Sequence, residues 1–137
     1  MPQPGEILYY QDYMFEDGAS ADKLFIVLNA ADIKLPSLVL KTTSQPKWYA
    51  GATRGCNPQK RVFFVPADWD KCFKRDTYIQ LPQIIEIPTV ELLSGSLSKR
   101  IRFVGSLSGD CYAQLKNCLK GFSKDLSERH WKLIFHS

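Results

Sequence analysis

The chain of 137 residues has few of the side chains on which metal sites and histidine-based active sites depend. Its two histidines, His130 and His136, both lie among the last eight residues, which excludes a catalytic histidine pair within the main body of the domain. No two of its four cysteines have the Cys-x-x-Cys spacing of common zinc sites. We therefore predict that the protein uses neither a metal ion nor a cofactor.

Long hydrophobic runs are missing as well. The longest apolar runs have only four or five residues, as at positions 24–28, whereas a membrane helix needs about 20. The first 20 residues hold four acidic side chains and no basic one, which is unlike a secretory leader. A domain of this length can bury a core without disulfides. We expect a cytoplasmic protein without a membrane span, in which the cysteines, Cys56, Cys72, Cys111 and Cys118, are reduced thiols.

Charge is present but unevenly distributed. Residues 1–32 carry six acidic side chains against a single basic one, Lys23. Residues 41–75 carry eight basic and two acidic side chains, and residues 99–137 carry eight and three. Such a polarised chain favours a polyanionic or acidic partner, although a basic face that meets only solvent explains the same pattern.

Hydrophobic periodicity predicts short strands followed by helices. Apolar runs predict strands over residues 6–10, 23–30, 37–43, 61–65, 76–81, 84–87 and 100–104, with one helical turn over 89–95. An apolar stripe at positions 111, 115, 118, 119 and 122 predicts a helix that begins near Ser108 or Asp110 and ends at Gly121. The fold class is therefore mainly β with an α appendage. We expect a small barrel with its closing helix over residues 1–122 and a helical tail over 123–137.

Residues 44–60 predict a long loop that mixes cations with aromatic rings. Rings can stack on unpaired bases while cations meet phosphates, so this composition suits single-stranded RNA. The alternative is structural: Trp48 and Tyr49 could cover one end of the barrel.

Six segments resemble, in order and spacing, the MazF/PemK family of toxins from toxin–antitoxin modules. They are PGEILY at 4–9, FEDG at 15–18, KLFIVL at 23–28, LKTTSQ at 40–45, FKRDTYIQLPQI at 73–84 and VGSLS at 104–108. The resemblance covers residues 4–120. It implies a small SH3-like barrel, of the MazF/CcdB type, that forms a homodimer.

The resemblance also implies an activity. Family members are the toxins of type II modules and cut single-stranded mRNA without a metal, leaving a 2′,3′-cyclic phosphate and a 5′-hydroxyl, until a small acidic antitoxin neutralises them. The family's phosphate-binding arginine and hydrogen-bonding threonine fall, by motif, on Lys23 and Thr43, the implied catalytic residues. Lysine offers a point charge where arginine offers a planar fork, and the proline that follows the family's arginine is replaced by Leu24.

Further RNA contacts are expected around these two positions. The candidates are Ser44, Gln45, Lys47, Trp48, Arg54, Lys60 and Asp76. Arg54 could restore a guanidinium to the site. Asp76 is either a carboxylate near the cleft or a turn residue that caps backbone amides. We interpret Lys74 and Arg75 as solvated surface.

Two other functions fit the same sequence. A non-catalytic barrel of this kind would bind nucleic acid or protein without cutting it, and Lys23 in place of arginine favours this alternative. A CcdB-like barrel would poison a protein target such as gyrase through a C-terminal helix that ends in apolar and aromatic residues, as does the tail here.

Overall fold

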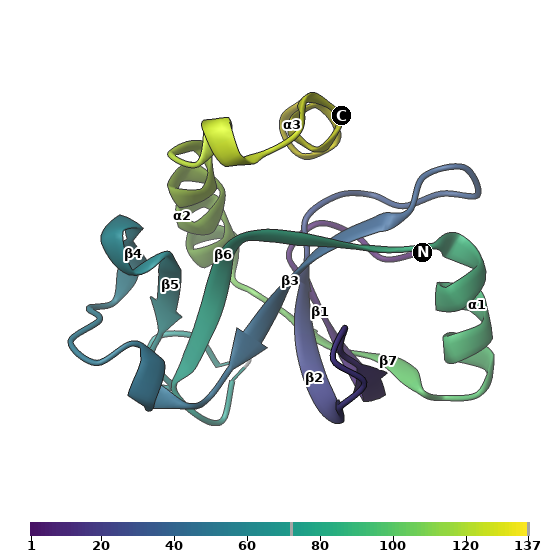
Figure 1. Ribbon diagram of the computed structural model, residues 1–137, viewed down its shortest axis with the longest axis horizontal. Coiled ribbons are helices and arrows are strands. Elements are labelled where there is room, and N and C mark those ends of the chain that lie inside the picture. Colours follow the sequence, from purple (N-terminus) through teal and green to yellow (C-terminus); the bar gives the residue numbers. More distant parts are fainter. Residues whose placement is uncertain (72, 137) are drawn as a thin grey trace.

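The computed structural model describes residues 1–71 and 73–136 and shows, within them, an antiparallel sheet accompanied by helices (Figure 1). The strands are β1 (Glu6–Met14), β2 (Ser20–Val27), β3 (Ser37–Thr43), β4 (Gly55–Asn57), β5 (Val62–Val65), β6 (Thr77–Ile87) and β7 (Ile101–Ser106). The α-helices are α1 (Thr89–Leu97), α2 (Gly109–Lys120) and α3 (Glu128–Phe135). The predicted mainly β fold with a helical appendage is confirmed.

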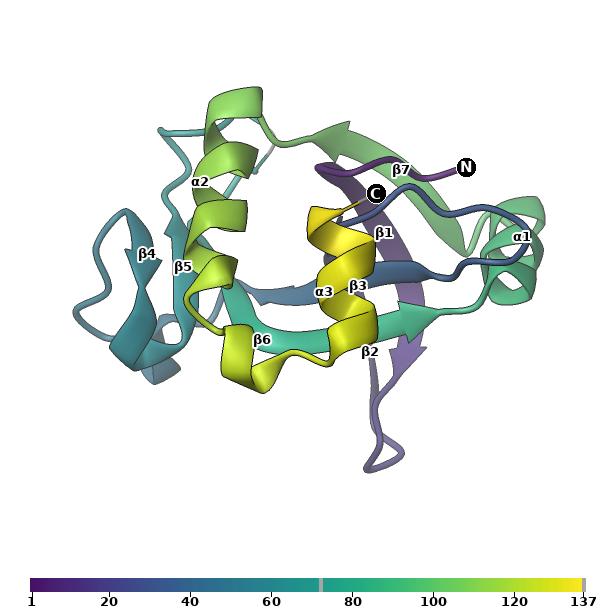
Figure 2. The same cartoon turned by 90° about the horizontal axis from the view of Figure 1, so that it is seen from above.

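The sheet is open, so the expectation of a closed SH3-like barrel is wrong. Its strand order is β4-β5-β6-β3-β2-β1-β7, with β4 and β7 as unpaired edges. Helix α2 joins these edges instead. It follows β7 after two residues and lies beside β4 (Figure 2), to which a disulfide between Cys56 and Cys118 ties it. Since a helix occupies this position, β4 and β7 do not form the ladder that would close a barrel.

Both faces of the sheet are covered because side chains alternate along each strand. On β2, Ile26 belongs to a core shared with α2 and α3, whereas Phe25 and Val27 belong to a second core shared with α1. The tail takes part in the first core through Ile134, whose side chain is buried. Residues 123–137 thus include a helix that packs on the domain.

Strand β6 runs through Pro82, where the sequence predicted two separate pieces. Its ladder with β3 pairs Ile79 with Thr42 and Ile84 with Leu40, and it is irregular between these pairs. Pro82 lies within this irregular stretch. A residue without a backbone N–H is tolerated where no regular ladder bond is required, so the strand continues past it.

Gly95 lets α1 approach β7 closely. A Cβ atom at Gly95 would lie 2.5 Å from Cδ1 of Ile101, a buried side chain. We expect Gly95→Ala to lower the free energy of unfolding by about 1–3 kcal/mol through overpacking, despite the better helix propensity of alanine. Chemical denaturation checks this, with exposed Ser94→Ala as the control. A more stable Gly95→Ala protein would contradict it.

Candidate functional site

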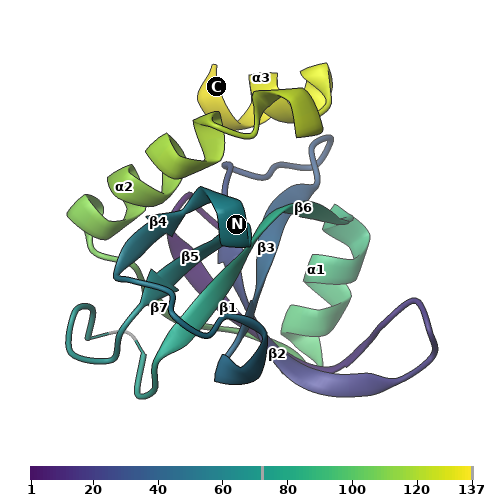
Figure 3. The same cartoon turned by 60° about the vertical axis from the view of Figure 1, so that its left-hand side comes forward.

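A groove forms where β2 and β3 separate. The ladder between them joins only residues 25–27 of β2 to 39–41 of β3. Beyond these residues, the start of β2 pairs with β1 alone, and Thr42 and Thr43 pair with β6. The β1–β2 hairpin therefore projects from the body of the sheet as a two-stranded arm (Figure 3).

Two side-chain hydrogen bonds cross the gap. The hydroxyl of Thr42 donates to the carbonyl oxygen of Leu24 at 2.9 Å. The ammonium of Lys23 donates to the carbonyl oxygen of Thr42 at 3.4 Å. Each bond satisfies a backbone oxygen beyond the end of the ladder, and together they hold the arm against the sheet.

The groove beside this gap has a volume of about 640 Å³. Its lining residues are Tyr9, Asp22, Lys23, Leu24, Thr42, Thr43, Ser44, Phe73, Lys74, Arg75, Thr77 and Val104. The two positions implied to be catalytic, Lys23 and Thr43, thus meet in one groove although they come from different strands. Ser44 joins them there.

Lys23 is a partly buried cation. Its Nζ lies 5.6 Å from the ring centre of Phe15, and Nζ of Lys41 lies 5.7 Å from the same centre. Burial, followed by repulsion from Lys41, lowers the pKa of Lys23 below the ordinary lysine value. A lysine of lowered pKa loses its proton more readily than an exposed one, which suits it to general acid chemistry as well as to charge stabilisation.

Thr43 has a hydroxyl hydrogen that can donate into the groove. Its Oγ1 accepts a hydrogen bond from the backbone N–H of Gln45 at 3.1 Å. That bond uses the oxygen as an acceptor and orients it, while the O–H remains available for a ligand. Ser44 is exposed beside it and offers a second hydroxyl.

Six polar or charged groove residues were not predicted as site residues from the sequence: Tyr9, Asp22, Thr42, Lys74, Arg75 and Thr77. Lys74 and Arg75 are exposed, as expected, but the loop that follows β5 brings them to the groove opposite the arm. Arg75 therefore adds an arginine to the groove lining, which also holds Lys23. Their only signal in the sequence is membership of the basic stretch 41–75, which did not distinguish them from its other cations.

The remaining predicted RNA contacts occupy other places. Within the described residues, the groove lining includes none of Gln45, Lys47, Trp48, Arg54, Lys60 and Asp76. Arg54 lies over the ring of Trp69 at 4.3 Å, and the carboxylate of Asp76 accepts from the N–H of Ala67 at 3.0 Å, which is the turn role. Trp48 is 71% exposed with Lys47 over its ring. Lys60 is also exposed and lies near Gly51.

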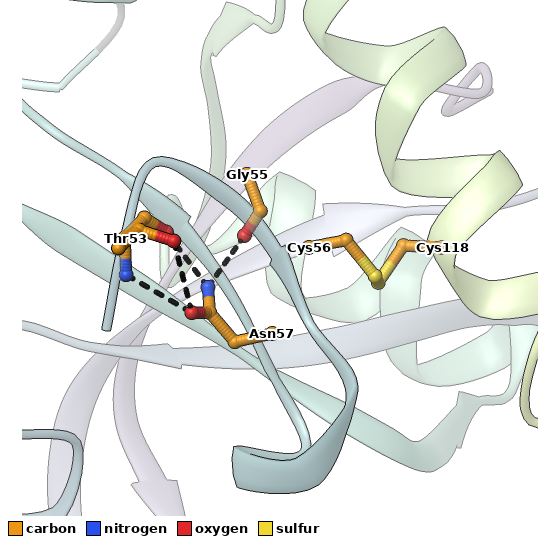
Figure 4. The surroundings of a disulfide bond; sticks show 5 residues. All are labelled: Thr53, Gly55, Cys56, Asn57 and Cys118. Carbon is orange, nitrogen blue, oxygen red and sulfur yellow. Dashed lines mark hydrogen bonds between the residues drawn. A yellow bond between two sulfur atoms is a disulfide. The ribbon is translucent and has the colours of Figure 1, made fainter. Parts of the chain in front are cut away.

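The long loop is anchored at both ends. Near its start, Tyr49 stacks on Tyr78 of β6 with ring centres 5.4 Å apart. Near its end, the Asn57 side chain accepts from the N–H of Thr53 and donates to the carbonyl oxygens of Thr53 and Gly55 (Figure 4). The loop thus has a fixed path with Trp48 on its outside.

The prediction of reduced thiols is wrong for two of the cysteines. Cys56 of β4 and Cys118 of α2 form a disulfide, with Cα atoms 5.5 Å apart (Figure 4). Cys111 and Cys118 both lie on the buried side of α2, as their spacing predicted. Cys72 lies outside the described residues.

Among the described helices, none is long and apolar enough to cross a membrane.

The comparisons with known proteins give no independent support for the resemblance to the MazF/PemK family. No protein-family model and no curated protein matches the chain.

Proposed function

We propose that the protein is a metal-independent endoribonuclease of the MazF/PemK type that cuts single-stranded RNA in the groove between β2 and β3. One observation carries the proposal. Lys23 and Thr43, which the resemblance selects from segments 20 residues apart, line the same groove together with Arg75. The agreement between motif position and spatial position supports an active site there.

The groove offers a proton donor and phosphate-binding groups for this reaction. Attack of a ribose 2′-oxygen on the adjacent phosphorus forms a P–O2′ bond and breaks the P–O5′ bond, giving a 2′,3′-cyclic phosphate and a 5′-hydroxyl. The proton of the attacking 2′-hydroxyl passes to solvent water. Lys23 donates its proton to the departing O5′ and offsets charge on the phosphoryl oxygens. The Thr43 and Ser44 hydroxyls donate to those oxygens, and Arg75 can bind a neighbouring phosphate through its planar fork.

The proposed biological role follows from the same resemblance. The protein acts in the cytoplasm as the toxin of a type II toxin–antitoxin module, works as a homodimer, and is neutralised by a small acidic antitoxin. The basic surplus of residues 41–75 and 99–137 supports both an RNA substrate and an acidic protein partner.

The test is cleavage of a mixed-sequence RNA in the presence of EDTA. We expect cleavage by the wild-type protein and a loss of about 100-fold in rate for Thr43→Ala, because one hydrogen-bond donor to the transition state is removed. Thr53→Ala is the matched control, since Thr53 lies in the loop near Asn57. No cleavage by the wild type, or equal rates for the two variants, would overturn the proposed activity.

The non-catalytic alternative rests on the hydrogen bond from Lys23 to the Thr42 carbonyl, which gives this lysine a structural task. A binding module would show salt-dependent RNA affinity without products. The gyrase-poison alternative receives less support because Ile134 of α3 is buried in the domain core rather than presented to a target.

A further inference from the structure

A carboxylate-bearing residue also lines the groove. Asp22 precedes Lys23 on β2, and both residues belong to the groove lining together with Lys74 and Arg75. Oδ2 of Asp22 accepts from the hydroxyl of Tyr9 at 2.6 Å, and its Oδ1 accepts from the N–H of Asp12 at 2.9 Å. The two oxygens are thus held by donors from β1 on the same arm.

A fixed anion in an RNA groove cannot bind a phosphate, because like charges repel. It can accept hydrogen bonds from the N–H groups of a nucleobase. Each carboxylate oxygen has two lone-pair directions, so one acceptor position on each oxygen remains after the bonds from Tyr9 and Asp12. Guanine presents two adjacent donors, N1–H and the N2 amine, on one edge, and these match the two oxygens of a carboxylate.

We propose that Asp22 selects guanine in the RNA strand that the groove holds. The inference rests on the proposed function, since it takes RNA as the occupant of the groove. It adds a substrate preference: one base of the bound strand is read by hydrogen bonds to its Watson–Crick edge.

Tyr9 is the positioning residue for this selection. The guanidinium of Arg102 lies over the Tyr9 ring at 4.7 Å and helps to hold the ring in place. The hydrogen bond from Tyr9, followed by that from the Asp12 amide, lowers the pKa of Asp22. The same bond to Asp22 raises the pKa of Tyr9. Tyr9 therefore remains a neutral donor, and Asp22 remains an anionic acceptor, through the physiological range.

The test measures binding rather than cleavage. The probes are 2′-O-methyl oligonucleotides, which lack the attacking hydroxyl: an oligouridine with one central guanine, the same strand with adenine, and the same strand with inosine, which lacks the N2 amine. For the wild type we expect about tenfold tighter binding of the guanine strand than of the adenine strand, with inosine between them.

Asp22→Asn replaces one acceptor by a donor, so we expect the three strands to bind it within about twofold of one another. Tyr9→Phe should retain part of the preference, and Glu16→Gln, on the same arm but outside the groove lining, should retain all of it. A wild type without guanine preference, or an Asp22→Asn protein that keeps it, would overturn the inference. Selective binding without cleavage of ordinary RNA would instead overturn the proposed nuclease activity and leave the guanine contact standing.

Discussion

Replacement of Lys23 by alanine is expected to lower the rate of RNA cleavage about 1,000-fold. This loss is larger than the one expected for Thr43→Ala. The Lys23→Ala variant loses both the proton donor for the departing oxygen and the positive charge beside the phosphoryl group. Lys23→Arg keeps the charge and should lose far less. Single-turnover cleavage of a short RNA measures these rates, and a Lys23→Ala protein within tenfold of the wild type would contradict the assignment.

The pH dependence gives an independent check of the same residue. Lys23 must be protonated to donate, so the cleavage rate falls as pH rises through its pKa. Because burial and Lys41 lower that pKa, the fall occurs at lower pH than an exposed lysine would give. Lys41→Ala removes the repulsion and should move the alkaline limb of the pH–rate profile upward. If the alkaline limb of the profile is unchanged in Lys41→Ala, the decrease in cleavage rate at high pH is due to a group other than Lys23.

The largest expected effect on stability comes from the Cys56–Cys118 disulfide. The bond joins residues 62 positions apart, and a cross-link across a loop of this length restricts the unfolded chain by about 4 kcal/mol. Cys56→Ser should lower the free energy of unfolding by a comparable amount. The substitution is made at Cys56 because this residue is exposed, whereas Cys118 is buried and packs in the core.

Denaturant unfolding with and without a dithiol reductant separates the cross-link from local packing. Without reductant the wild type should be the more stable protein, and with reductant the two proteins should unfold at the same denaturant concentration. A stability difference that persists in reductant would show that Cys56→Ser acts by disturbing the packing of β4 and not by removing the cross-link. The wild-type measurement in reductant also gives the stability expected in the cytoplasm, the proposed location, because that compartment keeps most protein thiols reduced.

Local signals predicted much of the fold. The strand over residues 37–43 follows a helix-breaking proline and has the predicted bounds, and α2 begins after the Ser108 cap and ends before Gly121. These features depend on residues within one turn or one strand. The open sheet could not be predicted in this way, because whether β4 meets β7 or α2 depends on contacts between segments far apart in the sequence.

The same distinction between local and long-range signals applies to the residues of the candidate site. Lys23, Thr43 and Ser44 could be named from motif positions, and the structure places them together. Asp22 and Arg75 could not, because they reach the groove through the separation of β2 from β3 and the path of the loop after β5. The loop 44–60 shows the converse: its composition suits RNA, yet Arg54 is held over Trp69 away from the groove.

The separation of β2 from β3 also distributes the site between two parts of the fold. Thr43 and Arg75 belong to the body of the domain, whereas Asp22 and Lys23 lie at the base of the projecting arm. Tyr13, farther out on the arm, packs against the second core, so the position of the arm depends on that core as well. The proposed reaction therefore requires the arm and the body to keep one alignment, because Lys23 lies on the arm and Thr43 on the body.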